Sequence, residues 1–307
     1  MYYIGVDLGG TKICTGLMNE AGELLHVVEC PTRATEGPKA VLQRIVDSVR
    51  SIRCAEPELP VSGIGIGAPG PLNPHTGTLH NPPNLPGWDG LPLREWVHEA
   101  TGLPTVLDND ANAAAAAEHW FGAGKGTRNM VYVTVSTGIG AGVVVDGQVR
   151  QGTAGNFGEV GHIIVHPGGR RCKCGNAGCL EVLASGTAIA ERAAAVYGQP
   201  LSAKDVAERA ASGDAVAEAI LRDAFRYLGI GMVNLVNLFD PEVMVIGGGV
   251  AQMGRPLFDS VRQALCDNHF NPRSAEIPVL PALLGTKAGV MGAAVLALHA
   301  FGSPRVG

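Results

Sequence analysis

The sequence predicts an α/β fold built from two similar halves, with a cleft between them. The first observation is a pattern of strand, glycine turn, strand, turn and further strand that begins at residue 2 and begins again at residue 130. Each copy continues into alternating strands and helices, which indicates a duplicated architecture. The second observation is size, because 307 residues, 46% of them hydrophobic, suffice for two domains rather than one.

Short apolar runs between turn residues predict the strands, and apolar residues at helical spacing predict the helices. Residues 68–92 are rich in Pro, Gly and Asn and cannot form a long helix. Asp146-Gly147 predicts a hairpin turn. The expected strands are 2–8, 12–18, 24–30, 61–67, 105–108, 130–136, 141–146, 241–249 and 277–280, and the expected helices are 37–54, 110–120, 186–197, 202–212, 214–238, 254–268 and 287–301.

These elements group into two domains and a returning helix. We expect a small N-terminal α/β domain over residues 1–120 and a larger α/β domain over 121–289 that carries a cysteine-rich loop. We expect the C-terminal helix, at 290–307, to pack back on the first domain.

Composition excludes several classes of function. The net charge is −5 and the pI about 6.0, with no basic stripe, which argues against nucleic-acid binding. No apolar run approaches the roughly 18 residues needed to cross a bilayer, so we expect no membrane partner. The N-terminal residues lack the charged and apolar regions of a signal peptide, and we expect a cytoplasmic protein. Four of the seven cysteines are scattered, as small buried side chains in a reducing compartment often are.

Two glycine loops stand at equivalent points of the two halves. The first is Asp-Leu-Gly-Gly-Thr-Lys at 7–12, and the second is Ser-Thr-Gly-Ile-Gly at 136–140. Glycine lets backbone N–H groups approach an anion closely, Thr11 adds a hydroxyl, and Asp7 could hold Mg²⁺ through water. Either loop alone is better explained as a hairpin turn, but the pair favours phosphate binding. Gly247–Gly249 is either a third close-approach site or a simple strand-to-helix turn.

Two nucleotide-binding motifs are only apparent. Residues 65–70 fit G-x-G-x-x-G, but the chain continues as Pro71-Leu72-Asn73-Pro74, which forbids the helix that a dinucleotide fingerprint requires. Gly124-Lys125 resembles the end of a phosphate-binding P-loop, but Gly126 stands where Ser or Thr is needed. We reject both motifs.

One cluster has the spacing of a metal site. His162, Cys172, Cys174 and Cys179 read H-x9-C-x-C-x4-C and suit a closed tetrahedral Zn²⁺ site, which would be structural because no position is left for water. Reduced thiols without metal are the weaker alternative, and His166 is a competing ligand.

Three carboxylates are candidates for chemistry. Asp110 follows a short strand and precedes a helix, so it is either a helix N-cap or first-turn residue, or an acid–base group at the end of a strand. Glu159 and Glu181 are tethered to the cysteine-rich loop and could accept hydrogen bonds from sugar hydroxyls, or they could be solvated surface charges.

The chain resembles the ROK family (repressors, uncharacterised reading frames and kinases) nearly end to end, and is most similar to its bacterial ATP-dependent glucokinases. The motifs that carry the resemblance are Asp7-x-Gly-Gly-Thr-Lys12, Asn109-Asp-Ala-Asn112, Gly158-Glu-Val-Gly-His162, Cys172-x-Cys-Gly-x-x-Gly-Cys-Leu-Glu181 and Ala288-Gly-Val-Met-Gly-Ala-Ala294. The cysteine motif and the Glu-x-x-His motif are specific together, whereas the glycine loops alone are not.

The resemblance implies an actin/hexokinase-like fold that binds ATP and a sugar in its cleft, with Asp110 as the base for the sugar 6-hydroxyl. His162 would bind zinc through one ring nitrogen and sugar through the other. Ser136 departs from the Gly of many relatives, and its Cβ limits the approach of a phosphate. The implied sugar contacts are Gly70, Asn84, Asn109, Asp110, Glu159, His162 and Glu181, and the ATP and phosphate contacts are Asp7, Gly9, Gly10, Thr11, Lys12, Thr137, Gly138 and Gly248.

The expected reaction is phosphoryl transfer from MgATP to a hexose 6-hydroxyl, with glucose as the preferred acceptor. An N-acetylglucosamine or N-acetylmannosamine kinase, or a fructokinase, is the alternative within the family. A non-catalytic sugar sensor of the same fold is the alternative of a different class. We also expect a homo-oligomer, either a dimer or a tetramer.

Overall fold

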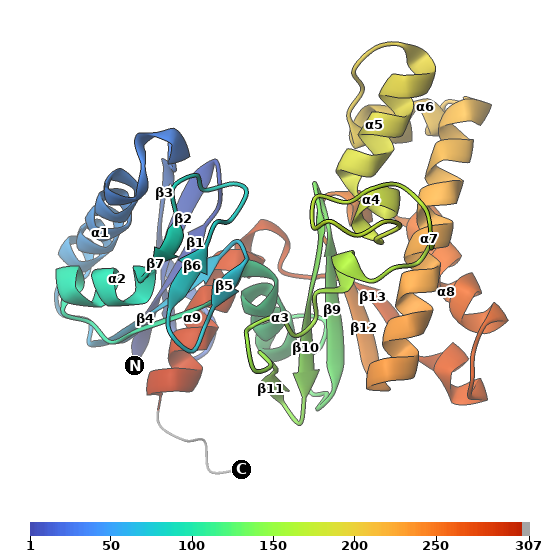
Figure 1. The fold of residues 1–307 in the computed structure, drawn as a ribbon. Helices are drawn as coiled ribbons and strands as arrows, with labels where there is room; N and C mark the ends of the chain where they lie inside the picture. The colour runs from blue at the N-terminus through green and yellow to red at the C-terminus, as the bar shows by residue number, and fades with distance from the viewer. Residues whose placement is uncertain (303–307) are drawn as a thin grey trace. The chain divides into compact units, whose positions relative to one another are not determined.

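The computed structural model describes residues 1–302, which form two compact α/β units. Unit 1 comprises residues 1–125, 148–157 and, from 286, the C-terminal part; unit 2 comprises residues 126–147 and 158–285 (Figure 1). The boundaries thus lie at 125 and 286, where the sequence suggested 120 and 290. The segment 148–157 belongs to unit 1, although the sequence analysis placed it in the second domain. The last part of the expected helix 290–307, residues 303–307, lies outside the described residues.

The sheet of unit 1 has the strand order β3-β2-β1-β4-β8. Strands β1 to β3 form an antiparallel meander, and β4 and β8 continue it in parallel with β1. Strands β1 and β4 are mostly apolar and almost wholly buried, as expected for strands covered on both faces, whereas the edge strand β3 alternates between half-buried and exposed residues. The bounds are β1 Tyr2–Leu8, β2 Lys12–Asn19, β3 Leu24–Pro31, β4 Val61–Ala68 and β8 Thr105–Asn109.

Helix α9 contacts β1, β4 and α3 within unit 1. Small residues make this packing close, because a side chain on Gly65 of β4 would overlap the carbonyl oxygen of Ala293. The strand runs through Gly65 without a helix after it, which confirms the rejection of the dinucleotide motif. The helices of unit 1 are α1 Pro38–Ala55, α2 Leu93–Thr101, α3 Asp110–Phe121 and α9 Ala288–Phe301, with the short 3₁₀ helix η1 Ala34–Glu36 before α1 and the 3₁₀ helix η5 Gly285–Lys287 at the border of the unit.

A three-stranded sheet of order β5-β6-β7 lies within the Pro/Gly-rich stretch, where the sequence predicted only the absence of a long helix. Its strands are β5 Leu72–Asn73, β6 Thr78–His80 and β7 Asp89–Leu91. The buried side chains of Leu79, Leu85 and Trp88 join the core of unit 1 and anchor this stretch.

The sheet of unit 2 contains β10, β9, β12 and β13 in this order, with β9 and β10 antiparallel and β12 parallel to both β9 and β13, while β11 lies in the segment 148–157 of unit 1. Five α-helices and three 3₁₀ helices accompany it within the described residues. The strands are β9 Met130–Val135, β10 Ile139–Val145, β11 Gln148–Val149, β12 Val243–Gly247 and β13 Val279–Pro281; the helices are η2 Val160–His162, α4 Glu181–Ala184, α5 Gly186–Tyr197, α6 Ala203–Ala211, α7 Ala215–Phe239, η3 Val250–Met253, α8 Arg255–Asp267 and η4 Pro272–Glu276.

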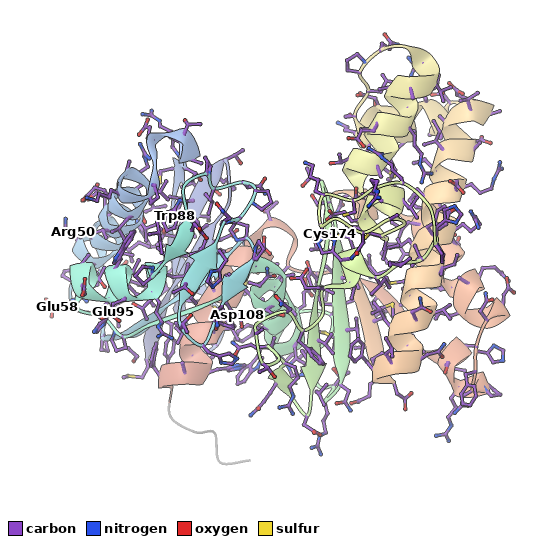
Figure 2. The ribbon with its side chains drawn as sticks, viewed as in Figure 1. Arg50, Glu58, Trp88, Glu95, Asp108 and Cys174 are labelled. Carbon is purple, nitrogen blue, oxygen red and sulfur yellow. The ribbon has the colours of Figure 1, made fainter. Side chains whose placement is uncertain are left out.

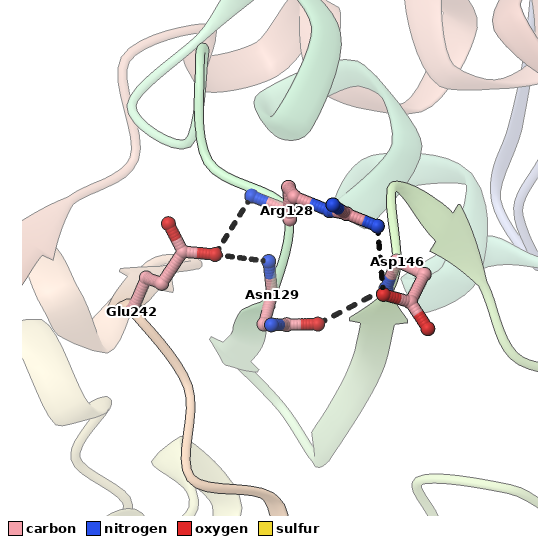
Figure 3. Close-up of polar contacts among 4 residues, drawn as sticks. All are labelled: Arg128, Asn129, Asp146 and Glu242. Atoms are coloured by element: carbon pink, nitrogen blue, oxygen red, sulfur yellow. Dashed lines mark hydrogen bonds and ion pairs between the residues drawn. The ribbon is translucent and has the colours of Figure 1, made fainter.

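The predicted hairpin at Asp146-Gly147 forms after β10. Both residues have positive φ, at 54° and 76°, as a type I′ turn requires. Asp146 accepts a hydrogen bond from the Arg128 side chain at 3.1 Å and donates its N–H to Asn129 Oδ1 at 3.0 Å (Figure 3). Glu242 Oε1 accepts the N–H groups of Arg128 and Asn129, both at 2.9 Å. These contacts fix the start of β9 between its two neighbouring strands.

Within residues 1–302, none of the helices combines the length and the hydropathy that a membrane span needs.

Candidate functional site

The first glycine loop joins β1 to β2 and consists of residues 9–11. The N–H of Gly9 donates to Lys12 O at 2.9 Å, and Thr32, just after β3, donates its hydroxyl to Gly9 O at 2.6 Å. Among residues 1–302, the N–H groups of Gly10 and Thr11 have no acceptor. The loop is therefore held by its carbonyl oxygens and offers two backbone donors to an anion.

Gly10 also brings the sugar-binding candidate Asn84 to this loop. A Cβ on Gly10 would lie 2.8 Å from the Cβ of Asn84, so only glycine allows this approach. Asn84 is exposed, and the stretch that carries it is anchored by the buried Trp88, whose carbonyl accepts the N–H of Asn81 at 2.9 Å (Figure 2). In unit 1 a predicted phosphate residue and a predicted sugar residue are thus neighbours.

Asp7 and Lys12 lie at the facing ends of β1 and β2. Burial raises the pKa of Asp7, with the Lys12 charge opposing this and the Glu29 charge adding to it. Lys12 Nζ lies 2.7 Å from Glu29 Oε1, and both side chains are half exposed. An exposed pair of this kind contributes little to stability, so Lys12 can exchange Glu29 for another anion at low cost.

The second glycine loop, residues 136–138, joins β9 to β10 in unit 2. Its geometry involves Glu181, whose Oε2 accepts the N–H of Ile139 at 3.0 Å. A Cβ on Gly138 would come within 2.5 Å of the same oxygen, so Gly138 makes room for the carboxylate. Gly248, with φ 86°, packs against the carbonyl of Val135 directly before this loop. Gly138, Glu181 and Gly248, which are expected to bind ATP or sugar, therefore lie together at the end of β9.

The junction of β8 and α3 carries Asn109 and Asp110. Asn109 is the N-cap of α3, because its side chain accepts the N–H of Ala111 at 2.8 Å. Asp110 is exposed in the first turn, and its Oδ1 accepts the same N–H at 2.8 Å. The sequence allowed Asp110 to be either the N-cap or a first-turn residue of α3. The structure shows the first-turn position, because the extended backbone of an N-cap residue is found at Asn109 and not at Asp110. A Cβ on Gly70 would lie 3.2 Å from Asn109 Nδ2, so Gly70 belongs to the same junction.

Glu159 directly precedes the 3₁₀ helix η2, and His162 is the last residue of that helix. Desolvation raises the pKa of Glu159, His162 opposes the shift and the Glu181 carboxylate adds to it. In unit 2, the charges of His162 and Glu181 therefore both act on the Glu159 carboxylate, and all three side chains are expected to bind sugar.

His162, Cys172, Cys174 and Cys179 come together in the cysteine-rich loop. Their potential ligand atoms all lie within 4.8 Å of one another (Figure 2 labels Cys174). His162 Nδ1 is 3.7 Å from Cys172 Sγ, and the sulfurs of Cys174 and Cys179 are 3.6 Å apart. Ligands at 2.3 Å from a tetrahedral zinc would be about 3.8 Å apart, so the spacing fits Zn²⁺, and it is far too long for a disulfide.

His166, the competing candidate ligand, does not belong to this cluster. Its ring lies 5.7 Å from that of Tyr227, and it is absent from the group of ligand atoms found within the described residues. His162 faces the cysteines through Nδ1, which leaves Nε2 for another partner.

Sequence reasoning missed two polar residues in this region. Thr32 follows a strand and has no motif around it, yet it fastens the first glycine loop. Gln151 donates to Asp108 across 43 residues of sequence, a separation at which no local signal exists.

The ROK family model matches residues 3–300, almost the whole chain. The chain belongs to the ROK family. A ROK hexokinase of Thermus thermophilus superposes with a TM-score of 0.88 at 40% identity, covering 98% of this chain and 99% of that one. A ROK glucokinase of Streptomyces griseus, solved in complex with glucose and AMPPNP, has a TM-score of 0.81 at 36% identity and covers 97% and 100%. The α/β fold with two mixed sheets is therefore the actin-like fold of ROK kinases.

The curated ROK relatives include several activities. A glucokinase of Halalkalibacterium halodurans is 39% identical and covers 95% of this chain and 93% of its own length. An N-acetylmannosamine kinase of Escherichia coli is 33% identical over 97% and 98%. A xylose repressor of Caldicellulosiruptor bescii is 31% identical over 94% of this chain and 76% of its own length.

Proposed function

We propose that this ROK protein transfers the γ-phosphoryl group of ATP to the 6-hydroxyl of a hexose, and that glucose is its preferred acceptor. The observation that carries the proposal is the exposed Asp110 carboxylate in the first turn of α3, beside Asn109, which fixes the start of that helix. The glucokinases among its relatives support the choice of sugar.

The phosphates of ATP are bound mainly by backbone donors. The N–H groups of Gly10 and Thr11 indicate an anion site, because no acceptor within residues 1–302 receives a hydrogen bond from them. Lys12 adds a positive charge once it leaves Glu29. Asp7 would hold the Mg²⁺ that accompanies ATP through water, and the ion would neutralise part of the phosphate charge. The proposed ATP residues are Asp7, Gly9, Gly10, Thr11, Lys12, Thr137, Gly138 and Gly248.

Asp110 accepts the proton of the sugar 6-hydroxyl as that oxygen attacks phosphorus. The N-terminus of α3 stabilises negative charge in the first turn, where Asp110 lies, and a carboxylate at that place can serve as a general base. Most of the remaining work is positioning, as in other phosphoryl transfers. The proposed sugar contacts are Gly70, Asn84 and Asn109 in unit 1 and Glu159, His162 and Glu181 in unit 2.

We propose that Zn²⁺ is the metal of the cysteine cluster and that it is structural. The loop has little apolar core of its own, and four soft or borderline ligands would fix its fold. If His162 held the metal through Nδ1, its Nε2 would remain available to a sugar hydroxyl, and the ring would be fixed in the orientation of that contact.

A hexose panel tests the substrate. We expect a higher kcat/KM for glucose than for N-acetylglucosamine, N-acetylmannosamine or fructose, because a pocket that pairs its polar groups with hydroxyls rejects an analogue that leaves them unpaired. The N-acetylmannosamine kinase among the relatives makes that sugar the main alternative. A higher kcat/KM for an N-acetylated sugar would replace glucose in the proposal. We further propose a cytoplasmic homo-oligomer, which light scattering on purified protein can check for subunit number.

A further inference from the structure

Asp108 is a buried carboxylate that the proposed transfer does not use. It lies in β8 directly before Asn109 and Asp110, and only 2% of its surface is exposed (Figure 2). Burial raises its pKa, while hydrogen bonds from Asn112, Gln151 and the Asn109 backbone, and the charge of His75, oppose the shift. Burying a carboxylate costs free energy of desolvation unless hydrogen-bond donors offset it. The donors around Asp108 are therefore part of what keeps it in this position.

Three donors from three segments meet on this carboxylate. Oδ1 accepts the Asn109 N–H at 2.7 Å and the Asn112 side-chain amide at 2.9 Å. Oδ2 accepts the side-chain amide of Gln151 at 2.7 Å. The end of β8, the first turn of α3 and the segment 148–157 are therefore joined at one point, and in the sequence Asp110 lies between the donors Asn109 and Asn112.

The segment 148–157 is attached to unit 1 at a second place. His75 Nε2 lies 2.9 Å from Gly152 O, and the Phe157 N–H donates to Gln151 O at 3.2 Å, which closes the segment into a loop. The chain then runs directly into Gly158 and Glu159. The segment that carries Gln151 therefore leads directly, along the chain, into the motif that carries Glu159 and His162.

We propose that Asp108 is a positioning residue for the sugar reaction, acting through Gln151. It holds the turn that carries Asp110 and the segment that leads to Glu159 in one arrangement, and this role rests on the proposed sugar-kinase function. Without the Gln151 hydrogen bond, the segment samples other conformations and a smaller fraction of molecules can bind sugar. Apparent affinity falls by that fraction. The residues proposed for ATP make none of these contacts, so ATP binding is unaffected.

Gln151→Leu removes the donor and keeps the size of the side chain. We expect KM for glucose to rise about tenfold, from the loss of one charge-assisted hydrogen bond, with KM for ATP unchanged. Gln148→Leu is the matched control, since Gln148 is exposed in the same segment. An unchanged KM for glucose in Gln151→Leu, or equal rises in both KM values, would overturn the proposal.

Exchange of donor and acceptor provides a rescue. Gln151→Glu places two carboxylates against each other and should raise KM for glucose, whereas Asp108→Asn combined with Gln151→Glu restores a donor–acceptor pair and should return it to within about threefold of wild type. A double variant no better than Gln151→Glu would contradict the proposal.

Hydrogen exchange separates this inference from the proposed function. In protein without ligand, Gln151→Leu should speed amide exchange in residues 148–157 and leave exchange in β9 unchanged. This result is expected even if no sugar is phosphorylated, in which case the kinase assignment fails alone. Unchanged exchange in the segment would show that Gln151 does not hold it.

Discussion

Asp110→Asn separates the two roles that a carboxylate at the start of a helix can have. The capping role belongs to Asn109, which already accepts the Ala111 N–H at 2.8 Å. Asn at position 110 keeps an oxygen where Oδ1 now accepts the same N–H, also at 2.8 Å. The substitution therefore preserves shape and hydrogen bonding and removes only the negative charge and the ability to take up a proton.

The two roles predict effects of different size. Loss of a charge in the first turn of α3 costs about 0.3–1 kcal/mol of stability, which corresponds to a fall in Tm of no more than about 4 °C. Loss of a general base lowers kcat by about 10²–10⁴-fold, or about 2.7–5.4 kcal/mol in the activation barrier. The catalytic effect should thus exceed the effect on stability several-fold.

The assay is steady-state kinetics beside a melting curve and a glucose titration. We expect a folded protein that still binds glucose and whose kcat is lowered by the factor expected for loss of a general base. Asp205→Asn is the matched control, because Asp205 occupies the first turn of α6 in a capping box with Ser202, away from the proposed site residues, and kcat should be unchanged. A folded Asp110→Asn variant with nearly wild-type kcat would refute the assignment of Asp110 as base.

Three further predictions concern the metal, the second glycine loop and pH. Purified protein should contain about one zinc per chain, and Cys174→Ser should lose it and destabilise the loop; protein never exposed to chelator that contains no zinc would exclude the metal site. Glu181→Ala should raise KM for both ATP and glucose, because Glu181 accepts the Ile139 N–H beside Gly138, whereas Glu159→Ala should raise only KM for glucose; an unchanged KM for ATP in Glu181→Ala would separate Glu181 from the loop. Burial raises the pKa of Asp108, so the stability it contributes is present below the ordinary Asp pKa of about 3.9 and is lost as pH rises through the folded-state pKa. The difference in unfolding free energy between Asp108→Asn and wild type should therefore shift in favour of the variant as pH rises from 4 to 7. Profiles of unfolding free energy against pH that run parallel in the two proteins would contradict this prediction.

The sequence predicted the long elements well because their signals are local. Strands such as β1 and β9 are short runs of mostly apolar residues, and α7 begins after Asp214, which caps it as sequence rules expect. The hairpin at Asp146-Gly147 follows from the backbone preferences of two residues.

The remainder depends on tertiary contacts or on single-residue geometry. Strands β5 to β7 have two or three residues each, too few for periodicity to reveal. The sequence left open whether Asp110 is the N-cap of α3 or a first-turn residue, because the two positions differ by one residue in backbone dihedrals, below the resolution of pattern rules. The attachment of residues 148–157 to unit 1 depends on Gln151 and His75, whose partners lie far away in sequence.

The candidate site divides in the same way. The His/Cys cluster was predictable because its four residues are confined to 18 positions with metal-site spacing, and the structure brings their potential ligand atoms within 4.8 Å of one another. The contact of Glu181 with the loop at Gly138 was not, because 42 residues separate Glu181 from Ile139. Local motifs identify the chemistry, whereas only the folded chain shows which residues support them.

The most direct test of the central claim is formation of ADP by the purified protein with MgATP, with and without glucose, and with the product identified by phosphorus NMR. We predict glucose-dependent turnover on the order of 1–100 s⁻¹ and a phosphate monoester on the 6-oxygen. Glucose binding by calorimetry without any ADP formation would contradict the account and make the protein a sugar sensor.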